Sequence, residues 1–195
     1  QKWIAMDEWW RKHFALLIES GLTKGDIEKA VTSGAIQLRD GFSEFADLLQ
    51  AHNIPLVIMS SSGLGSESIA LYLKHAGKLS DNVHIISNEY EWDEAGRAIG
   101  FREPIIHALS KHETVIQDYP AFESVRNRKN VLLLGDSVGD LGMVQGFEFE
   151  HLLTVGFLKE GGKGDAGHHR DAFDVVLDED ASMEYVNDLL REIIE

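Results

Sequence analysis

The sequence predicts an α/β fold, a doubly wound parallel sheet that follows a helical N-terminal segment. Short apolar runs alternate with segments of helical spacing, which is the pattern of parallel strands joined by right-handed crossovers. The apolar run Val131–Gly135 indicates a strand buried on both faces, and Asp136 follows it at once. Residues 1–36 show helical patterns without a strand pattern. We therefore predict a helical segment over residues 1–36 and an α/β core over residues 37–195.

The N-terminal segment is expected to form amphipathic helices. Residues 3–20 carry apolar side chains at helical spacing, and Gly21 is expected to end this helix. A second helix should begin at Thr23, whose hydroxyl can cap it, and end near Ser33. A third amphipathic segment runs from Gly41 to His52.

The remaining elements follow the alternating pattern. In order, we expect the strand Leu56–Met59, the helix Glu67–His75, the strand Val83–Ser87, a hairpin through Trp92–Gly100, the helix Pro104–Lys111, the strands Val131–Gly135, Leu152–Phe157 and Val175–Leu177, and the helix Met183–Ile194. The glycine-rich stretch Lys159–Gly167 predicts a loop. We expect the adjacent His168 and His169 to be solvated rather than to bind one metal ion.

Composition restricts the class of protein. The chain has 18 Lys and Arg against 33 Asp and Glu, a net charge of −15, so we expect binding neither to nucleic acid nor to an anionic membrane. It has no cysteine, which excludes disulfides, a thiol nucleophile and a thiolate metal site. No apolar run approaches the roughly 18 residues that span a bilayer. We expect a cytoplasmic protein, which can still bind a small phosphorylated ligand through a divalent cation.

Two carboxylates follow the most apolar predicted strand. Asp136 and Asp140 are four residues apart, and a glycine precedes each of them. Ligands of open α/β sheets lie outside the carboxyl ends of the strands, and carboxylates beside a phosphate usually hold Mg²⁺. We predict that Asp136 and Asp140 form a Mg²⁺ site. The alternative is an acidic turn, since Asp, Gly and Ser are common turn residues.

A serine cluster and a lysine complete the candidate site. Ser60, Ser61 and Ser62 follow the strand Leu56–Met59 and precede a helix, where hydroxyls and amides can bind an anion. The alternative is a simple helix cap. Lys111 ends a predicted helix and can supply positive charge to a phosphate, although the local sequence alone favours a surface lysine.

The order of these motifs resembles a known superfamily. A serine after a strand, then Lys111, then Gly-Asp-Ser-x-Gly-Asp is similar to motifs two to four of the haloacid dehalogenase superfamily of phosphatases. The chain also resembles the eukaryotic cytosolic pyrimidine 5′-nucleotidase family (type III) along nearly its whole length, with almost constant spacing. The segments that carry this second resemblance are Glu8-Trp9-Trp10, Arg39-Asp40-Gly41-Phe42, Ile54–Gly65, Ile86-Ser87-Asn88, Gly100-Phe101, Ile106-His107, Lys111-His112, Leu134–Leu141 and Asp174–Leu177.

The resemblance implies a role for each candidate residue. Ser60 would bind the substrate phosphate, although one extra residue in the serine cluster leaves Ser61 as an alternative. Lys111 would neutralise the phosphate and the nucleophile. Asp136 would ligate Mg²⁺, and Asp140 would support the metal site directly or through water. His13 falls where the family has a polar residue on the substrate side, so it is a further candidate for substrate binding.

The resemblance also implies an activity. The family consists of Mg²⁺-dependent 5′-nucleotidases, and we expect a nucleoside 5′-monophosphate, above all a pyrimidine one, as the small-molecule substrate. Two alternatives are a phosphatase of the same superfamily acting on another phosphomonoester such as phosphoserine, and a phosphate-binding protein without catalysis. We interpret Trp9 and Trp10 as core residues rather than as ligand contacts.

The sequence departs from the family in one respect. The resemblance implies that residues 1–36 are part of a small helical cap and that residues 37–195 are the α/β core without its first strand. The nucleophile and the general acid of the family lie on that strand, in an Asp-x-Asp motif ahead of the cap, and no such motif precedes Glu8. Asp178-Glu179-Asp180 lies too near the C-terminus for this role. Without the nucleophile no aspartyl-phosphate can form, so we expect the chain alone to be inactive. Because the sequence begins at Gln1, we expect part of a longer enzyme; the alternative is a remnant that binds phosphate without turnover.

Overall fold

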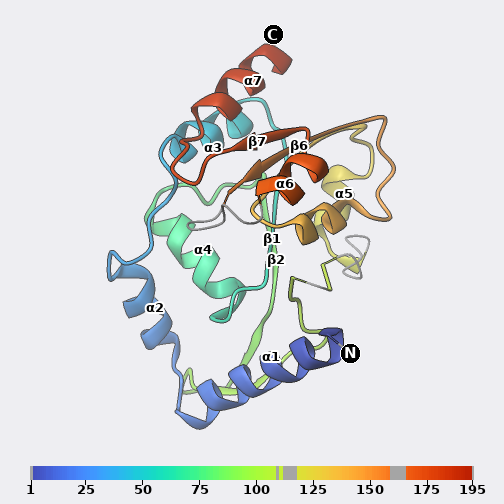
Figure 1. The fold of residues 1–195 in the computed structure, drawn as a ribbon. Coiled ribbons are helices and arrows are strands. Elements are labelled where there is room, and N and C mark those ends of the chain that lie inside the picture. Colours follow the sequence, from blue (N-terminus) through green and yellow to red (C-terminus); the bar gives the residue numbers. More distant parts are fainter. Residues whose placement is uncertain (1, 109, 112–117, 159–165, 195) are drawn as a thin grey trace.

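The computed structural model describes residues 2–108, 110–111, 118–158 and 166–194 and has an α/β fold (Figure 1). Its helices are α1 (Lys2–Glu19), α2 (Lys24–Thr32), α3 (Phe42–Ala51), α4 (Gly65–His75), α5 (Ala121–Val125), α6 (Ala166–Ala172), α7 (Glu184–Ile194) and a 3₁₀ helix, η2 (Val138–Val144). Its strands are β1 (Leu56–Ser60), β2 (Val83–Ser87), β3 (Tyr90–Trp92), β4 (Ala98–Phe101), β5 (Asn130–Gly135), β6 (His151–Phe157) and β7 (Val175–Leu177).

The strands form two parallel sheets and one hairpin. β1 and β2 pair in parallel, with Ser60 opposite Ser87 at their carboxyl ends. β5, β6 and β7 pair in parallel in that order, and the antiparallel pair β3–β4 is the predicted hairpin. The α/β class with parallel strands is confirmed. Among the described residues, however, the parallel strands form two sheets rather than one continuous sheet.

The predicted strands and five of the predicted helices are confirmed, with ends that agree within about two residues. Thr23 caps α2 as expected, because its hydroxyl accepts a hydrogen bond from the Asp26 amide while the Asp26 carboxylate accepts one from the Thr23 amide. Gly21 ends α1 with a φ of 79°, a value that few residues other than glycine adopt. The short helices α5, α6 and η2 were not predicted.

Two apolar cores lie on opposite faces of β1. Successive side chains of a strand point to opposite faces, which separates Leu56 from Met59. Leu56 packs with Leu132 and Leu134 of β5 against α3 and α7, so both parallel sheets border this first core. The second core contains the buried side chains of Met59, Ile86, Ile106, Ala121 and Val125. It brings together β1, β2, α5 and the segment that follows β4.

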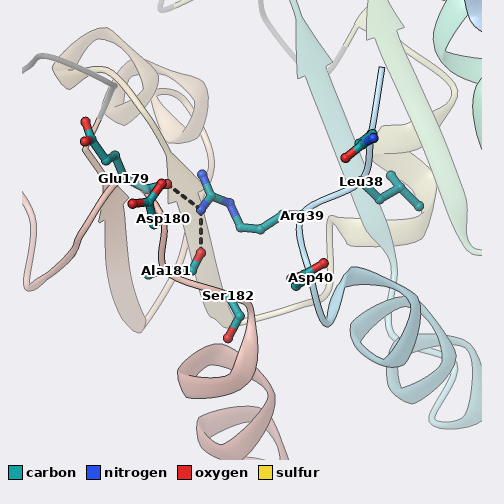
Figure 2. A pocket seen from close by; sticks show the side chains of 8 residues that line it. Leu38, Arg39, Asp40, Glu179, Asp180, Ala181 and Ser182 are labelled. Carbon is teal, nitrogen blue, oxygen red and sulfur yellow. Dashed lines mark hydrogen bonds between the residues drawn. The ribbon is translucent and has the colours of Figure 1, made fainter. Parts of the chain in front are cut away.

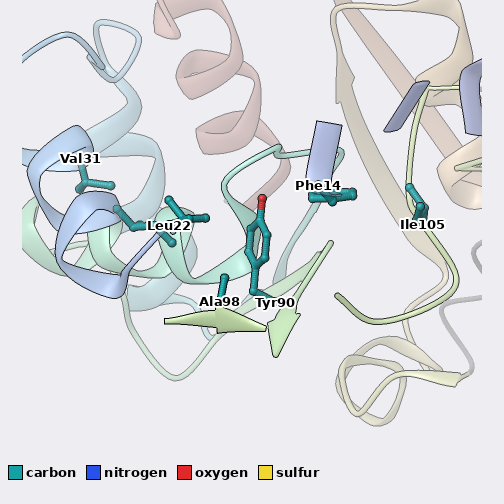
Figure 3. Close-up of a cluster of buried hydrophobic side chains, with 7 residues drawn as sticks. Phe14, Leu22, Val31, Tyr90, Ala98 and Ile105 are labelled. Carbon is teal, nitrogen blue, oxygen red and sulfur yellow. The ribbon is translucent and has the colours of Figure 1, made fainter. Parts of the chain in front are cut away.

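The N-terminal helices share a third core with the hairpin (Figure 3). Phe14 of α1 is 1% exposed, and its ring lies 5.4 Å from the Tyr90 ring of β3. Leu22, just before α2, and Ile27 and Val31 of α2 extend this core. Trp10 packs against it as predicted, whereas the interpretation of Trp9 as a core residue is wrong, since Trp9 is 56% exposed.

The helix predicted over Pro104–Lys111 is wrong for the described residues, which form irregular structure and a turn. Here side chains form hydrogen bonds with backbone amides and carbonyls that would bond to each other within a helix. The Ser110 hydroxyl accepts from the His107 amide at 2.9 Å and lies 3.1 Å from the Ile105 carbonyl oxygen, to which it donates. The Asn88 side chain bonds both the amide and the carbonyl of Ile106.

In the part of the chain that the structure describes, no helix combines the length and the apolar character needed to cross a bilayer.

Candidate active site

Asp140 folds back beneath the end of β5 and is 5% exposed. One carboxylate oxygen, Oδ2, accepts hydrogen bonds from the amides of Asp136 and Ser137, both at 3.0 Å. The Ser137 hydroxyl in turn caps η2 by accepting from the Gly139 amide. A Cβ on Gly135 would lie 2.8 Å from the Cβ of Asp140, so only glycine permits this close approach. The Gly-Asp-Ser-x-Gly-Asp sequence therefore builds one rigid turn.

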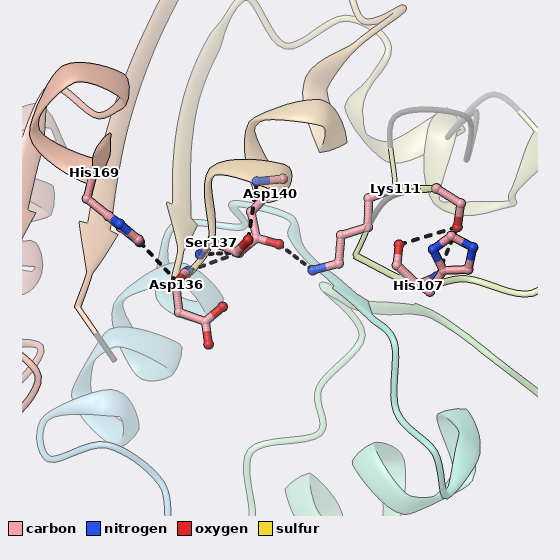
Figure 4. Close-up of polar contacts among 8 residues, drawn as sticks. His107, Lys111, Asp136, Ser137, Asp140 and His169 are labelled. Atoms are coloured by element: carbon pink, nitrogen blue, oxygen red, sulfur yellow. Dashed lines mark hydrogen bonds and ion pairs between the residues drawn. The ribbon is translucent and has the colours of Figure 1, made fainter. Parts of the chain in front are cut away.

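Lys111 reaches this turn from the other side of the site (Figure 4). Its Nζ lies 2.5 Å from Oδ1 of Asp140, and the two side chains are 12% and 6% exposed. The alternative of a surface lysine is therefore wrong. Burying an ion pair is costly unless further hydrogen bonds satisfy the charges, and the two backbone amides on Oδ2 do this for Asp140. The pair fixes a positive charge beside the end of β5.

Asp136 is exposed, and its carboxylate points away from the Lys111–Asp140 pair (Figure 4). Its carbonyl oxygen lies 3.2 Å from Nε2 of His169. His169 belongs to α6, is 7% exposed and stacks on Phe173 with ring centroids 5.7 Å apart. The expectation of a solvated His169 is wrong, because α6 was not predicted and turns this side chain inward. His168 is exposed, as expected.

The serine loop, which we define as residues 60–65, starts at the carboxyl end of β1. Ser60 and Ser61 are both half-buried. Ser87 lies opposite Ser60 on β2, and its hydroxyl is buried without a hydrogen-bond partner among the described residues. Buried hydroxyls are nearly always paired, so this edge of β1 and β2 is suited to receive a polar group.

His13 and Tyr90 hold the serine loop through one carbonyl group. The Tyr90 hydroxyl donates to the Gly63 carbonyl oxygen at 2.8 Å, and Nε2 of His13 lies 3.3 Å from the same oxygen. Burial raises the pKa of Tyr90 to about 12, so the hydroxyl keeps its proton at neutral pH. The His13 ring also stacks on Trp9 at 5.6 Å. The candidate His13 thus contacts the loop that carries Ser60, from a helix of the N-terminal segment.

Three contacts of the site were not predicted from the sequence, those of Asn88, Tyr90 and His169. Ile86-Ser87-Asn88 stood out only as a segment of family resemblance, and Tyr90 carried no signal of its own. The structure brings Lys111 and Asp140 together and places Asp136 next to them. Met59, the residue before Ser60, packs in the same cluster as Ile106 and Met143 of η2.

The residues present fit a Mg²⁺ ion in part. Mg²⁺ usually takes one or two protein carboxylates and completes its shell with water and substrate phosphate. Asp136 offers an exposed carboxylate at the end of β5, whereas both oxygens of Asp140 already accept hydrogen bonds. Within the described residues no group of three or more His, Cys, Asp or Glu side chains could hold a metal ion. The geometry favours Asp136 as the direct ligand and Asp140 as its support.

A separate polar pocket lies between the segment before α3 and the segment after β7 (Figure 2). Arg39 donates to the carbonyl oxygens of Glu179 and Ala181 there, and its guanidinium lies 4.3 Å from the centre of the Phe157 ring. The pocket is lined by Gln37, Leu38, Arg39, Asp40, Glu179, Asp180, Ala181 and Ser182. None of the predicted site residues lines it, so the pocket adds nothing to the candidate site.

Known proteins resemble this chain over nearly its whole length. 7-Methylguanosine phosphate-specific 5′-nucleotidase of Gallus gallus is 35% identical over 190 residues, which are 97% of this chain and 65% of that protein. Putative cytosolic 5′-nucleotidase 3 of Caenorhabditis elegans is 36% identical over 183 residues, 91% of this chain and 48% of that protein. The chain therefore spans less than two thirds of the length of these relatives.

Solved structures agree with this similarity. Cytosolic 5′-nucleotidase IIIB bound to cytidine superposes with a TM-score of 0.82 and 28% identity, over 95% of this chain and 62% of that one. A phosphoserine phosphohydrolase-like protein from Francisella tularensis subsp. tularensis SCHU S4 superposes with a TM-score of 0.56 and 16% identity, over 86% of this chain and 70% of that one. The second likeness is one of fold alone. Residues 1–194 match the family described as Pyrimidine 5′-nucleotidase (UMPH-1), and the chain belongs to this family.

Proposed function

We propose that the protein containing this chain hydrolyses nucleoside 5′-monophosphates, above all pyrimidine ones, to nucleoside and phosphate with the help of Mg²⁺. The observation that carries the proposal is the buried Lys111–Asp140 pair beside the exposed carboxylate of Asp136. The relatives named 5′-nucleotidases support the reaction, and the solved relative holds a pyrimidine nucleoside. The name of one relative also supports a cytoplasmic location.

Each residue has a role in this proposal. Ser60, with Ser61 as the alternative, binds the phosphate, and His13 approaches the substrate from α1. Asp140 holds the Lys111 amine at the end of β5. There the positive charge of Lys111 stabilises the phosphoryl group during its transfer. Asp136 would hold Mg²⁺, and the ion would supply further positive charge to the phosphoryl oxygens. In this proposal the chain thus supplies the groups that bind the phosphate and stabilise its charge, but not the nucleophile.

The nucleophile belongs to a strand that we place between β1 and β5. Each of these two strands pairs on one side only among the described residues, and both border the first core. A parallel strand between them would join the two sheets into one. The resemblance to the family assigns an Asp-x-Asp motif to that strand. With residues 1–36 as part of a cap, the two aspartates would face Lys111 and Asp136 below the cap.

Phosphate release by the full-length protein tests the proposed function. We expect release from UMP, CMP or 7-methylguanosine monophosphate in the presence of Mg²⁺, with a kcat/KM at least about tenfold above that for phosphoserine. Higher activity on phosphoserine would contradict a nucleotidase and favour another phosphatase. Binding of phosphate without any turnover would favour the non-catalytic alternative.

Asp136→Asn is expected to weaken Mg²⁺ binding by roughly tenfold or more, since loss of a ligand costs at least as much as loss of a supporting contact. Isothermal titration of Mg²⁺ into the 195-residue chain measures this change. Binding by the unmodified chain should itself be weak, because the proposed strand would supply further ligands. Asp47→Asn, on the exposed surface of α3, is the matched control and should leave the affinity unchanged. Equal affinities of Asp136→Asn and the unmodified chain would disprove the assignment.

A further inference from the structure

We infer that Asn88 is a positioning residue that holds the serine loop and the segment leading to Lys111 in one fixed arrangement. This inference rests on the proposed function, because it concerns the two elements to which phosphate binding is assigned. Asn88 directly follows β2, next to the paired ends of β1 and β2, and is 3% exposed. It contacts no reacting group itself in the proposed mechanism.

The side chain of Asn88 bonds two segments that are far apart in the sequence. Its Oδ1 accepts from the Ile106 amide at 2.8 Å, and its Nδ2 donates to the Ile106 carbonyl oxygen at 3.0 Å. The same Nδ2 lies 3.4 Å from the carbonyl oxygen of Ser62, to which it donates a longer hydrogen bond. Its own carbonyl oxygen accepts from the Ser66 amide at 2.7 Å. One buried residue thus connects Ser62 of the serine loop, and Ser66 directly after the loop, with Ile106.

Ile106 lies five residues before Lys111 in the sequence. Ile106 is 1% exposed and packs in the second core, so it cannot move without disturbing β1 and β2. Ser110 then closes the turn through its bonds to His107 and Ile105. The next residue is Lys111, whose amine contacts Asp140. Ser110, the neighbour of Lys111, is thus bonded to the two residues that flank Ile106.

The chemistry of this contact requires an amide. Asn88 must accept from one backbone group and donate to two others, and only a side chain with both a carbonyl and an NH₂ group does so at this length. In Asn88→Asp the NH₂ group becomes an oxygen that faces the carbonyl oxygens of Ile106 and Ser62. The buried oxygens then repel each other, and the two segments are expected to separate. Shifts of about 1 Å at a catalytic group can cost on the order of 10²-fold in rate.

Asn82 provides a matched control at the opposite end of β2. Its Nδ2 donates to the Ile54 carbonyl oxygen at 2.8 Å, and its Oδ1 accepts from the Ser80 hydroxyl at 2.6 Å. Asn82→Asp therefore makes the same chemical change, also against a backbone carbonyl. It lies at the amino end of the strand, because β2 begins at Val83. A merely structural role of Asn88 predicts the same result for both substitutions.

The experiment compares Asn88→Asp, Asn88→Ala and Asn82→Asp in the full-length protein. Calorimetry measures the Kd for inorganic phosphate, steady-state kinetics give kcat and KM for UMP, and thermal unfolding gives Tm. We expect both substitutions at Asn88 to raise the phosphate Kd about tenfold and to lower kcat/KM about 10²-fold, mainly through kcat. Asn82→Asp should lower Tm to a similar extent while its phosphate Kd and its kcat/KM stay within about twofold of wild type.

Three results would overturn the inference: wild-type phosphate affinity in folded Asn88 variants, an equal loss of affinity in Asn82→Asp, or failure of both Asn88 variants to fold. The last would assign Asn88 to folding alone. A wild-type protein that binds phosphate but hydrolyses no nucleoside monophosphate contradicts the proposed function only. In that case the phosphate affinities of the three variants still decide on Asn88.

Discussion

The 195-residue chain is expected to release no measurable phosphate from UMP or CMP, whereas a chain extended upstream by the Asp-x-Asp strand of the family is expected to be active. The structure supplies a lysine, a serine loop and a carboxylate for the metal. Among the described residues, however, no strand lies between β1 and β5, so no aspartate stands at the end of such a strand. Removing a catalytic nucleophile lowers kcat by roughly a million-fold even where binding survives. A colorimetric phosphate assay with and without Mg²⁺ compares the two chains.

The two chains must both be folded for this comparison to hold. Circular dichroism should give similar helix content per residue, and both chains should bind inorganic phosphate, the shorter one more weakly. Mg²⁺-dependent turnover by the 195-residue chain at rates typical of enzymes, about 1–10³ s⁻¹, would contradict the prediction. It would mean that the nucleophile lies within these 195 residues.

Lys111→Ala in the extended enzyme is expected to lower kcat/KM on the order of 10²-fold or more, because it removes a preorganised positive charge at the phosphate. The buried pair with Asp140 gives a second consequence. An unpaired buried carboxylate destabilises a protein by about 3–5 kcal/mol, so the variant should also unfold at a lower urea concentration. Kinetics must therefore be measured at a temperature where circular dichroism shows the variant to be folded.

Lys74→Ala is the matched control for this substitution. Lys74 lies in the last turn of α4 and is exposed, and exposed charges contribute little to stability or to a distant site. Its kcat/KM should stay within about twofold of the unmodified enzyme. A folded Lys111→Ala variant with the same kcat/KM as Lys74→Ala would remove Lys111 from the site and leave only a structural role for its contact with Asp140.

Local sequence patterns were sufficient for most elements of the fold. The strands β1, β2, β5, β6 and β7 are mostly apolar because parallel strands are covered on both faces, so each could be found without its neighbours, although His84 interrupts β2 and Thr154 interrupts β6. Thr23 and Gly21 marked helix ends, because capping and a positive φ depend on a few adjacent residues. The carboxylates of Asp136 and Asp140 were predicted as a pair for the same reason, since strand, glycine and aspartate are consecutive in the chain.

The sequence by itself thus determined the α/β class, the parallel strands and the turn that carries the two aspartates. Only the tertiary structure decided that Asp140 accepts Lys111 and two amides while Asp136 stays exposed, that His169 turns inward, and that residues 104–108 are not helical. These outcomes depend on hydrogen bonds between residues far apart in the sequence, such as those of Asn88 with Ile106. Propensity reports only the preference of a segment on its own, and a buried side chain that satisfies the backbone can override it.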